Sequence, residues 1–304
     1  MIAIDCDFPG GNILIDRIEG DTAWIRQDLR DTQGPWFWWC FRVQGGAGRT
    51  LRFEFTDGDV IGVRGPACSL DGGRNWLWLG RGCVNGAAFT LSLPAGCDEA
   101  RLSCGIPYLR QNLKEFLAAY SGDAALESKT LCASRKGRAV ELLRLAPTES
   151  SCTHRLLFTA RHHGCESMAS YVMEGILEAM LGESEGGRWF RRTTAAWFVP
   201  FVDKDGVEDG DQGKNRKPRD HNRDYAGASL YPEVRAIRSR LLDPPEVRPQ
   251  IVLDLHCPGI RGEHSENIYF VGDDHGDNWA RVQRLCQILE SDRRGPLPYR
   301  QAAN

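Results

Sequence analysis

The sequence lacks any pattern that would pair its cysteines or gather them around a metal. Its eleven cysteines are scattered from Cys6 to Cys286, an odd number without Cys-x-x-Cys spacing. Disulfide frameworks and cysteine-based zinc sites require pairs at recurring spacings. We therefore expect reduced, mostly buried thiols and a reducing compartment.

Long apolar runs and an excess of basic charge are also missing. The opening segment Met1–Asp7 has neither the basic flank nor the apolar run of a signal peptide, and no later stretch is long enough to span a bilayer. The net charge of -3 gives no general attraction to nucleic acid or to an anionic membrane. We expect a cytoplasmic protein without nucleic-acid or membrane partners; nothing in the sequence indicates its oligomeric state.

The first hundred residues have the pattern of a β-sandwich. Short β-type runs alternate with Gly, Asp and Asn turns at a spacing of roughly 8–12 residues, which is typical of two packed antiparallel sheets. With 304 residues, the chain is long enough for two domains, and we assign residues 1–105 to this first one. The predicted strands are 12–16, 23–27, 36–43, 50–55, 59–63, 76–79, 88–93 and 100–104.

The pattern changes near Gly105-Ile106-Pro107, where an amphipathic helix is predicted over 108–120. Beyond it, strands alternate with helices, which is typical of an α/β domain with a largely buried sheet. We assign residues 106–304 to this second domain. The predicted strands are 155–160, 197–202, 250–255 and 267–271, and the predicted helices are 167–181, 230–242 and 278–291.

Two predicted strands of the second domain end in histidines. One delivers His163 and, three residues on, Glu166, whereas the other ends at His256. Sites in α/β sheets are built at the carboxyl ends of strands. Two imidazoles and one carboxylate leave a fourth position of a tetrahedral zinc ion for water, which is the arrangement of catalytic zinc. Alone, His-x-x-Glu is a weak signal, for which a capping or salt-bridging pair is the preferred explanation.

The sequence between these ligands makes the signal specific. Asp203-Lys204-Asp205-Gly206-Val207 is followed by Asn222-Arg223 before an aromatic, and then by Asp254-Leu255-His256. In this order the motifs resemble those of the zinc metallocarboxypeptidases, and the phrase 160–167 is similar to their cytosolic carboxypeptidase branch. The N-terminal segments 8–12 and 36–43 resemble the β-sandwich that precedes the catalytic domain in that branch.

The resemblance implies a fold and a set of roles. It predicts an α/β/α domain with a mixed sheet, one Zn²⁺ per chain held by His163, Glu166 and His256, and peptide or protein C-termini as substrate. Asn222 and Arg223 would bind the terminal carboxylate, a task that suits the fork of a guanidinium. Arg216 would stabilise the oxyanion, with Arg219 in reserve. The competing interpretation of this cluster is a solvated basic loop or a nucleic-acid patch, although Asp220 and Asp224 dilute its charge.

The sequence departs from the family pattern at several points. Asp203-Lys204 stands where the family has Asn-Pro, and Gly164-Cys165 stands where it has Pro-Gly. The family's general-base glutamate lies well beyond the third ligand, but only 48 residues follow His256, and Glu263, Glu266 and Glu290 lack its context. We therefore expect that the C-terminal part of the catalytic domain is missing from this chain.

Three functions fit these residues. The first is hydrolysis of a C-terminal peptide bond, for which a basic pocket would indicate acidic substrates. The second is zinc-dependent deacylation of small N-acyl amino acids, as in the aspartoacylase relatives, which resemble this chain only across its second domain. The third is a module that binds peptide C-termini without cleaving them, because the general base is unassigned.

Overall fold

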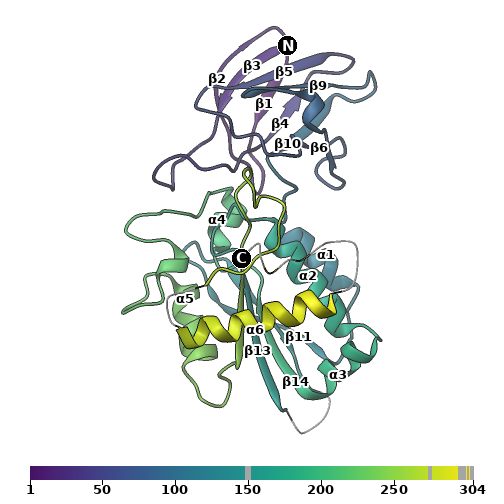
Figure 1. The fold of residues 1–304 in the computed structure, drawn as a ribbon. Coiled ribbons are helices and arrows are strands. Elements are labelled where there is room, and N and C mark those ends of the chain that lie inside the picture. Colours follow the sequence, from purple (N-terminus) through teal and green to yellow (C-terminus); the bar gives the residue numbers. More distant parts are fainter. Residues whose placement is uncertain (148–151, 273–275, 294–298, 300, 302–304) are drawn as a thin grey trace. The chain divides into compact units, whose positions relative to one another are not determined.

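The computed structural model describes residues 1–147, 152–272, 276–293, 299 and 301. The chain divides into two compact units, Met1–Cys257 and Pro258–Asn304. The first unit contains three five-stranded sheets (Figure 1). The second contains α6 (Gly276–Asp292). No helix among the described residues has the length and apolar character needed to cross a membrane.

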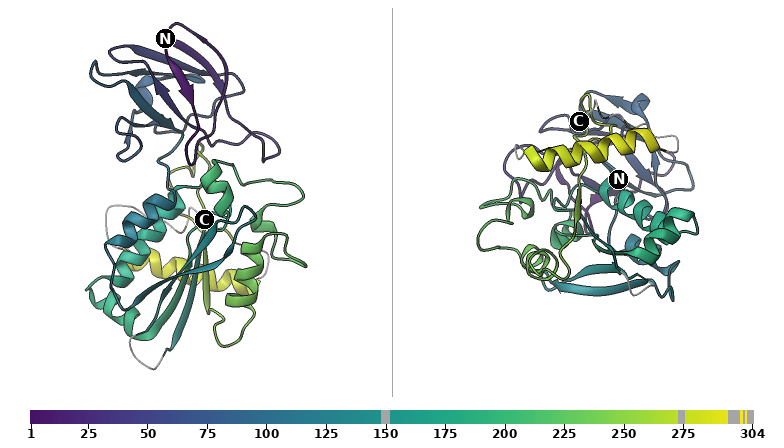
Figure 2. Two further views of the ribbon diagram at one scale, coloured as in Figure 1. Left: turned by 180° about the vertical axis from the view of Figure 1, so that it is seen from behind. Right: turned by 60° about the horizontal axis from the view of Figure 1, so that its bottom comes forward.

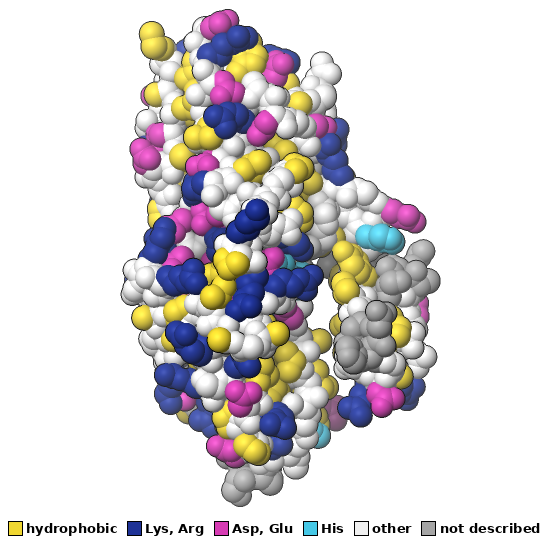
Figure 3. Space-filling view, turned by 90° about the vertical axis from the view of Figure 1, so that its left-hand side faces the viewer, with side chains coloured by type: hydrophobic (Ala, Val, Ile, Leu, Met, Phe, Trp, Pro, Cys, Tyr) yellow, Lys and Arg dark blue, Asp and Glu magenta, His cyan; other side chains and the backbone are white. Residues whose placement is uncertain are grey.

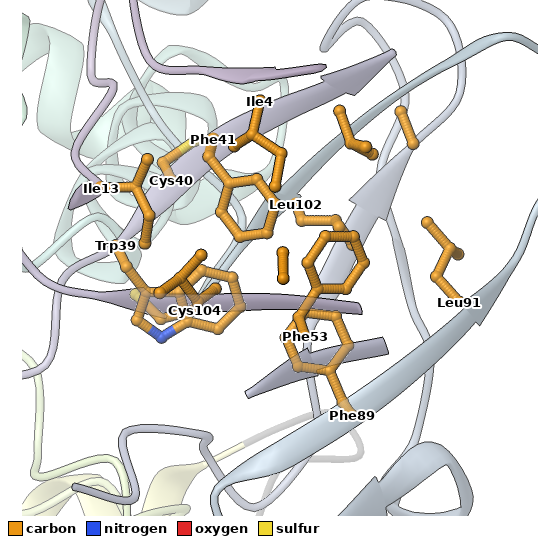
Figure 4. Close-up of a cluster of buried hydrophobic side chains, with 14 of the residues drawn as sticks. Ile4, Ile13, Trp39, Cys40, Phe41, Phe53, Phe89, Leu91, Leu102 and Cys104 are labelled. Carbon is orange, nitrogen blue, oxygen red and sulfur yellow. The ribbon is translucent and has the colours of Figure 1, made fainter. Parts of the chain in front are cut away.

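Two of the sheets form the sandwich that the sequence predicts. Strands alternate between buried and exposed positions, as in β5, where Leu51, Phe53 and Phe55 point inward. Trp39 and Phe89 pack with Phe53 into an aromatic core between the sheets (Figure 4). One sheet has the strand order β1 (Ala3–Asp5), β4 (Cys40–Gln44), β10 (Glu99–Ser103), β6 (Ala67–Ser69), β7 (Leu77–Trp78). The other sheet has the strand order β2 (Leu14–Glu19), β3 (Thr22–Arg26), β5 (Thr50–Phe55), β9 (Ala88–Ser92), β8 (Val84–Asn85). A 3₁₀ turn at Arg81–Cys83 precedes β8.

The sandwich differs from the prediction in several details, and the short strands β1, β6 and β8 were not predicted. Its strands pair antiparallel except β3 and β5, which are parallel because the intervening β4 belongs to the other sheet. The predicted strand 59–63 is wrong. Val60 and Ile61 are buried in the core, so their apolar character reflects packing rather than a ladder.

The third sheet is mixed and lies between helices, which confirms the predicted α/β/α architecture. One apolar core lies on the face covered by α1 and α2, and another lies on the face covered by α5 (Figures 1 and 2). The strand order is β11 (Leu126–Ala133), β12 (Ala139–Leu145), β14 (Thr194–Val199), β13 (His154–Ala160), β15 (Ile251–Leu255). The helices are α1 (Arg110–Ala118), α2 (Met168–Leu181), α3 (Glu185–Thr193), α4 (Lys204–Asp209), η2 (His221–Arg223), α5 (Pro232–Ile237) and η3 (Arg238–Leu242).

The β11–β12 hairpin was not expected from the sequence, because β11 is an edge strand whose exposed Glu, Ser, Lys and Thr side chains obscure the alternation. The predicted strand 267–271 is wrong, because those residues form no strand in the second unit. The predicted boundary between residues 105 and 106 coincides with no division between the two compact units and stays a prediction.

Candidate metal centre and adjoining cavity

The two strands that end in histidines lie side by side. β13 and β15 pair in parallel, with Thr159 opposite Asp254 and Ala160 opposite Leu255. The carboxyl ends of both strands therefore meet at one edge of the sheet, one residue before His256 and three before His163. Sequence positions some ninety residues apart converge there, as predicted from the strand ends.

A sharp turn after β13 aims the first ligand. Arg161 adopts the left-handed backbone region, which is rare for a residue with a side chain. Its buried guanidinium donates to the Tyr108 carbonyl at 2.8 Å and to Ser170 Oγ at 3.2 Å, which holds the turn against α2. Gly164 must lack a side chain, because a Cβ there would lie 2.8 Å from the Asp211 carbonyl oxygen.

Glu166 links the two histidines. Its Oε1 lies 2.8 Å from His163 Nδ1, and its Oε2 lies 2.6 Å from His256 Nδ1. His163 and Glu166 are buried, whereas 29% of the His256 side chain is exposed. Burial opposes ionisation of Glu166, yet the hydrogen bonds with both rings lower its pKa to about 2. The carboxylate is therefore charged at neutral pH.

The three ligand atoms lie within 4.8 Å of one another. One negative charge and two ring nitrogens at this spacing form a donor set that fits a divalent transition metal such as zinc. The partial exposure of His256 leaves one side of the cluster open to solvent. The residues present thus fit a metal, and their role as ligands stays a proposal.

Asp254 stands behind the cluster and contacts two histidines. Its Oδ2 lies 2.7 Å from His256 Nε2, and its Oδ1 lies 2.7 Å from His162 Nδ1 and accepts a 2.7 Å bond from Thr159 Oγ1. The other nitrogen of His162 lies 2.8 Å from the Tyr225 hydroxyl. A carboxylate on the far nitrogen of a ligating imidazole fixes its tautomer and orientation. His162, Asp254 and His256 also have the spacing of a second metal-binding group.

A cavity of about 540 Å³ adjoins His163 and is dominated by positive charge. Five cationic side chains and one carboxylate line it. Figure 3 shows Lys and Arg side chains gathered across the middle of one face of the molecule. The lining residues are Gln33, His163, Lys214, Asn215, Arg216, Lys217, Pro218, Arg219, Asp220 and Arg223.

The two residues predicted to bind a carboxylate, Asn222 and Arg223, have different surroundings in the structure. Arg223 ends the short turn η2, is exposed and lines the cavity, and its guanidinium has no hydrogen-bond or ion-pair partner among the described residues. Asn222, its half-buried neighbour, is not among the described residues that line the cavity. Only Arg223 of this pair is therefore brought together with His163.

Arg216 lines the cavity but is held by three carboxylates. Its Nε donates to Asp31 at 2.9 Å, one Nη pairs with Asp203 at 2.8 Å and the other donates to Asp211 at 2.8 Å. Burial alone would favour the neutral form, but these carboxylates raise the pKa of Arg216 further above its ordinary value. The reserve candidate, Arg219, donates to Asp224 at 2.6 Å.

Part of the cavity wall comes from the sandwich, which the sequence did not reveal. Asp31 accepts hydrogen bonds from the backbone N–H groups of Gln212 and Gly213 at 3.0 and 2.8 Å, and Gln33 lines the cavity. Trp36 donates to Cys165 Sγ at 3.0 Å. Residues 31–33 belong to a loop without periodicity, so no sequence signal marks them.

Comparison with known proteins supports the predicted relationship. No family model matches the chain. It is 28% identical to cytosolic carboxypeptidase 3 of Bos taurus over 216 residues, which is 67% of this chain and 21% of that protein. The chain thus spans about a fifth of the length of the curated carboxypeptidases that it matches.

Solved structures share the fold. A metallo-carboxypeptidase from Pseudomonas aeruginosa, in complex with (2-guanidinoethylmercapto)succinic acid, has a TM-score of 0.77 at 20% identity, covering 98% of this chain and 83% of that one. A metallo-carboxypeptidase from Burkholderia cenocepacia has a TM-score of 0.75 at 19% identity, covering 99% and 83%. The chain is therefore similar to the cytosolic carboxypeptidases, and its fold is that of metallo-carboxypeptidases of known structure.

Proposed function

We propose that the chain is a zinc-dependent carboxypeptidase that hydrolyses the C-terminal peptide bond of peptides or proteins, with one Zn²⁺ held by His163, Glu166 and His256. The observation that carries the proposal is the convergence of these three side chains beside a cavity rich in cations. A bound zinc ion would polarise the scissile carbonyl and acidify a water molecule. The names of the relatives also favour a cytosolic location.

Arg223 is the residue best placed to bind the terminal carboxylate. Its guanidinium is exposed on the cavity and unpaired among the described residues, so binding a carboxylate would displace no internal partner. A guanidinium can hold both carboxylate oxygens in a fork. Asn222 stays part of the proposal from the family motif, although it does not line the cavity.

Arg216 is proposed to stabilise the oxyanion. Three carboxylates fix its guanidinium and keep it charged, so that little reorganisation is needed during reaction. The same carboxylates weaken its pull on a substrate anion. Arg219 therefore stays in reserve for this role.

The cavity also favours an acidic substrate. Lys214, Arg216, Lys217, Arg219 and Arg223 face one another across it, with Asp220 as the opposing charge. A penultimate or terminal glutamate or aspartate would find positive potential there, whereas a basic side chain would meet repulsion. We therefore propose acidic peptide C-termini as the preferred class.

A binding module without catalysis is the second candidate, because no general base is assigned among the residues around the cluster. It shares the zinc site and Arg223 with the enzyme hypothesis. The two differ only in whether product forms. The deacylase alternative has no specific observation in its favour.

The test is to load the full chain with zinc and measure peptide binding and release of the terminal amino acid by mass spectrometry. Peptides ending in a free glutamate are expected to bind more tightly than their C-terminal amides, and a zinc chelator should stop turnover. Arg223→Ala should weaken binding about tenfold or more, because a charged hydrogen bond is lost. The exposed Arg235→Ala on α5 is the matched control.

The outcomes separate the candidates. Release of the terminal residue supports the carboxypeptidase. Binding that requires Arg223 without any release supports the binding module. Equal affinity for free and amidated peptides would contradict both.

A further inference from the structure

A second cavity lies on the other side of Arg216. It has a volume of about 410 Å³, within the range of small-molecule sites, and it shares only Gln33, Arg216 and Lys217 with the cavity beside His163. Its floor contains Asp203, His221 and Glu233, whose exposures are 1%, 2% and 2%. The proposed function uses none of these three residues.

The floor carries polar atoms without partners. Glu233 Oε2 and His221 Nδ1 are buried and make no hydrogen bond among the described residues. His221 Nε2 lies 3.8 Å from Asp203 Oδ1 and 3.9 Å from Glu233 Oε2, which is too far for a direct hydrogen bond. Buried polar groups in native proteins are nearly always satisfied. The Glu233 oxygen therefore lacks a donor, and His221 Nδ1 lacks a donor or an acceptor according to its tautomer.

Charge on the floor favours a cation. Asp31, Asp203 and Asp211 all contact Arg216, and Arg30 also pairs with Asp211, so three carboxylates face two guanidinium groups before Glu233 is counted. Burial, followed by the influence of Asp203 and Asp205, raises the pKa of Glu233 to about 7, as expected for a carboxyl without a cationic partner.

The spacing excludes a small metal ion as the occupant. Among the described residues, the groups whose ligand atoms all lie within 4.8 Å of one another are the two that contain His256, and the floor of this cavity is not one of them. Acceptors around an ammonium group stand farther apart than ligands around a metal, because each hydrogen bond is near 2.8 Å rather than near 2 Å. An organic cation therefore fits better.

The mouth of the cavity has the opposite charge. Arg135, Lys136 and Lys217 are exposed at its rim, and Lys136 pairs with Asp209 at 2.6 Å, which leaves Arg135 and Lys217 without a carboxylate partner among the described residues. The Arg135 guanidinium lies 4.4 Å from the centre of the Tyr231 ring, which in turn stacks on His221 with 3.6 Å between ring centres. Lys217 has no hydrogen-bond or ion-pair partner in the described part of the chain. A ligand that reaches from floor to rim would thus pass from negative to positive surroundings.

We propose that this cavity is a second ligand site, which binds a small molecule with a primary ammonium group at one end and a carboxylate at the other, as in a free amino acid. The ammonium donates to Glu233 and Asp203 on the floor, and the carboxylate lies at the rim near Arg135 and Lys217. The site does not depend on whether the chain cleaves peptides.

The experiment titrates the full chain with three probes by calorimetry and by ligand-observed NMR. Glycine carries both charges, ethylamine only the ammonium and propionate only the carboxylate. Glycine is expected to bind most tightly and ethylamine more weakly, whereas propionate should not compete with glycine. Glu233→Gln keeps the shape of the side chain and should weaken glycine about tenfold or more, because a charge-assisted bond is lost. The exposed Glu246→Gln is the charge-matched control.

Two further variants keep the test decisive. Lys217→Gln changes only an exposed side chain, and it should weaken glycine about threefold and leave ethylamine unchanged. Arg223→Ala alters the other cavity alone and should leave glycine binding intact. The proposal is overturned if no glycine binding is detected at glycine concentrations of tens of millimolar. In that case the floor of the cavity would bind only water. It is equally overturned if binding survives Glu233→Gln but is lost with Arg223→Ala, a result that would instead support the carboxylate site proposed beside His163.

Discussion

The two cavities on either side of Arg216 share three residues and yet differ in the placement of charge. Beside His163, the cations are partly or fully exposed and outnumber one carboxylate. On the other side, Asp203 and Glu233 are buried on the floor, whereas Arg135 and Lys217, which have no carboxylate partner among the described residues, stand at the rim. The same short segment, residues 216–223, thus serves a site for anions and a site for an ammonium group. Side chains from neighbouring elements, rather than the segment itself, therefore determine whether the surroundings in each cavity are mainly positive or mainly negative.

The comparison also separates two kinds of buried carboxylate. Glu166 lies between two imidazoles, and its pKa is lowered to about 2 despite burial. Glu233 is equally buried but has a neutral histidine and two aspartates as neighbours, and its pKa is raised to about 7. Burial acts in the same direction on both, so the difference arises from their partners.

The largest expected effect is on metal affinity. Glu166→Ala removes the carboxylate that both histidines face, and it should weaken zinc binding at least about a hundredfold, beyond the usual effect of losing a residue behind the ligands. Glu233→Gln should leave zinc affinity unchanged. Competition with a chromophoric chelator measures both. A comparable loss in the two variants would mean that the cavities are not separate sites.

The convergence of His163, Glu166 and His256 could be predicted, because it depends on regular structure. β13 and β15 are apolar runs that end in polar residues, and parallel pairing brings such ends together without any further information. The sandwich likewise follows from alternation in strands such as β5.

The second cavity could not be predicted in this way. His221 and Glu233 become neighbours because η2 and α5 fold over Asp203, and Asp31 reaches Arg216 from a loop of the sandwich. No periodicity connects these positions. Their contacts depend on the conformations of the connecting loops, and no periodic pattern in a single sequence predicts those conformations. The hairpin β11–β12 was missed for a related reason, since its polar edge hides the alternation.

A smaller effect is expected in the pH dependence of stability. The pKa of the Glu233 carboxyl is about 4.3 in the unfolded chain and about 7 in the folded chain. The folded state therefore keeps this proton to higher pH than the unfolded state does. As a result, the free energy of unfolding falls as the pH increases from about 4.3 to about 7. Gln cannot ionise. Relative to the wild type, Glu233→Gln should therefore gain about 2 kcal/mol between pH 4.5 and pH 7, after allowance for relaxation and water entry.

Chemical denaturation of both proteins across this pH range measures the difference. The charged or titratable neighbours of Glu233, which are Asp203, Asp205, Arg135 and His221, are present in both proteins, so their own titration largely cancels. Burial lowers the pKa of His221 to about 4 in the folded state, and its titration near pH 6.5 in the unfolded state is common to both proteins. A constant offset, with no change between pH 4.5 and pH 7, would show that Glu233 ionises normally and is not a buried, unpaired carboxyl.

The smallest effect tests whether the sandwich is an integral part of both cavities. Asp31 and Asp16 each accept a hydrogen bond from an arginine. Asp31 is mostly buried against Arg216 and also accepts from two backbone N–H groups. Asp16, in contrast, forms an exposed pair with Arg26. Asp31→Asn should therefore destabilise the chain by about 1 kcal/mol more than Asp16→Asn, since exposed ion pairs contribute little. It should also speed hydrogen exchange at the amides of Gln212 and Gly213. If the two variants had equal free energies of unfolding and exchange at Gln212 and Gly213 were unchanged, Asp31 would not stabilise the loop 211–216. The shape of the two cavities would then not depend on Asp31.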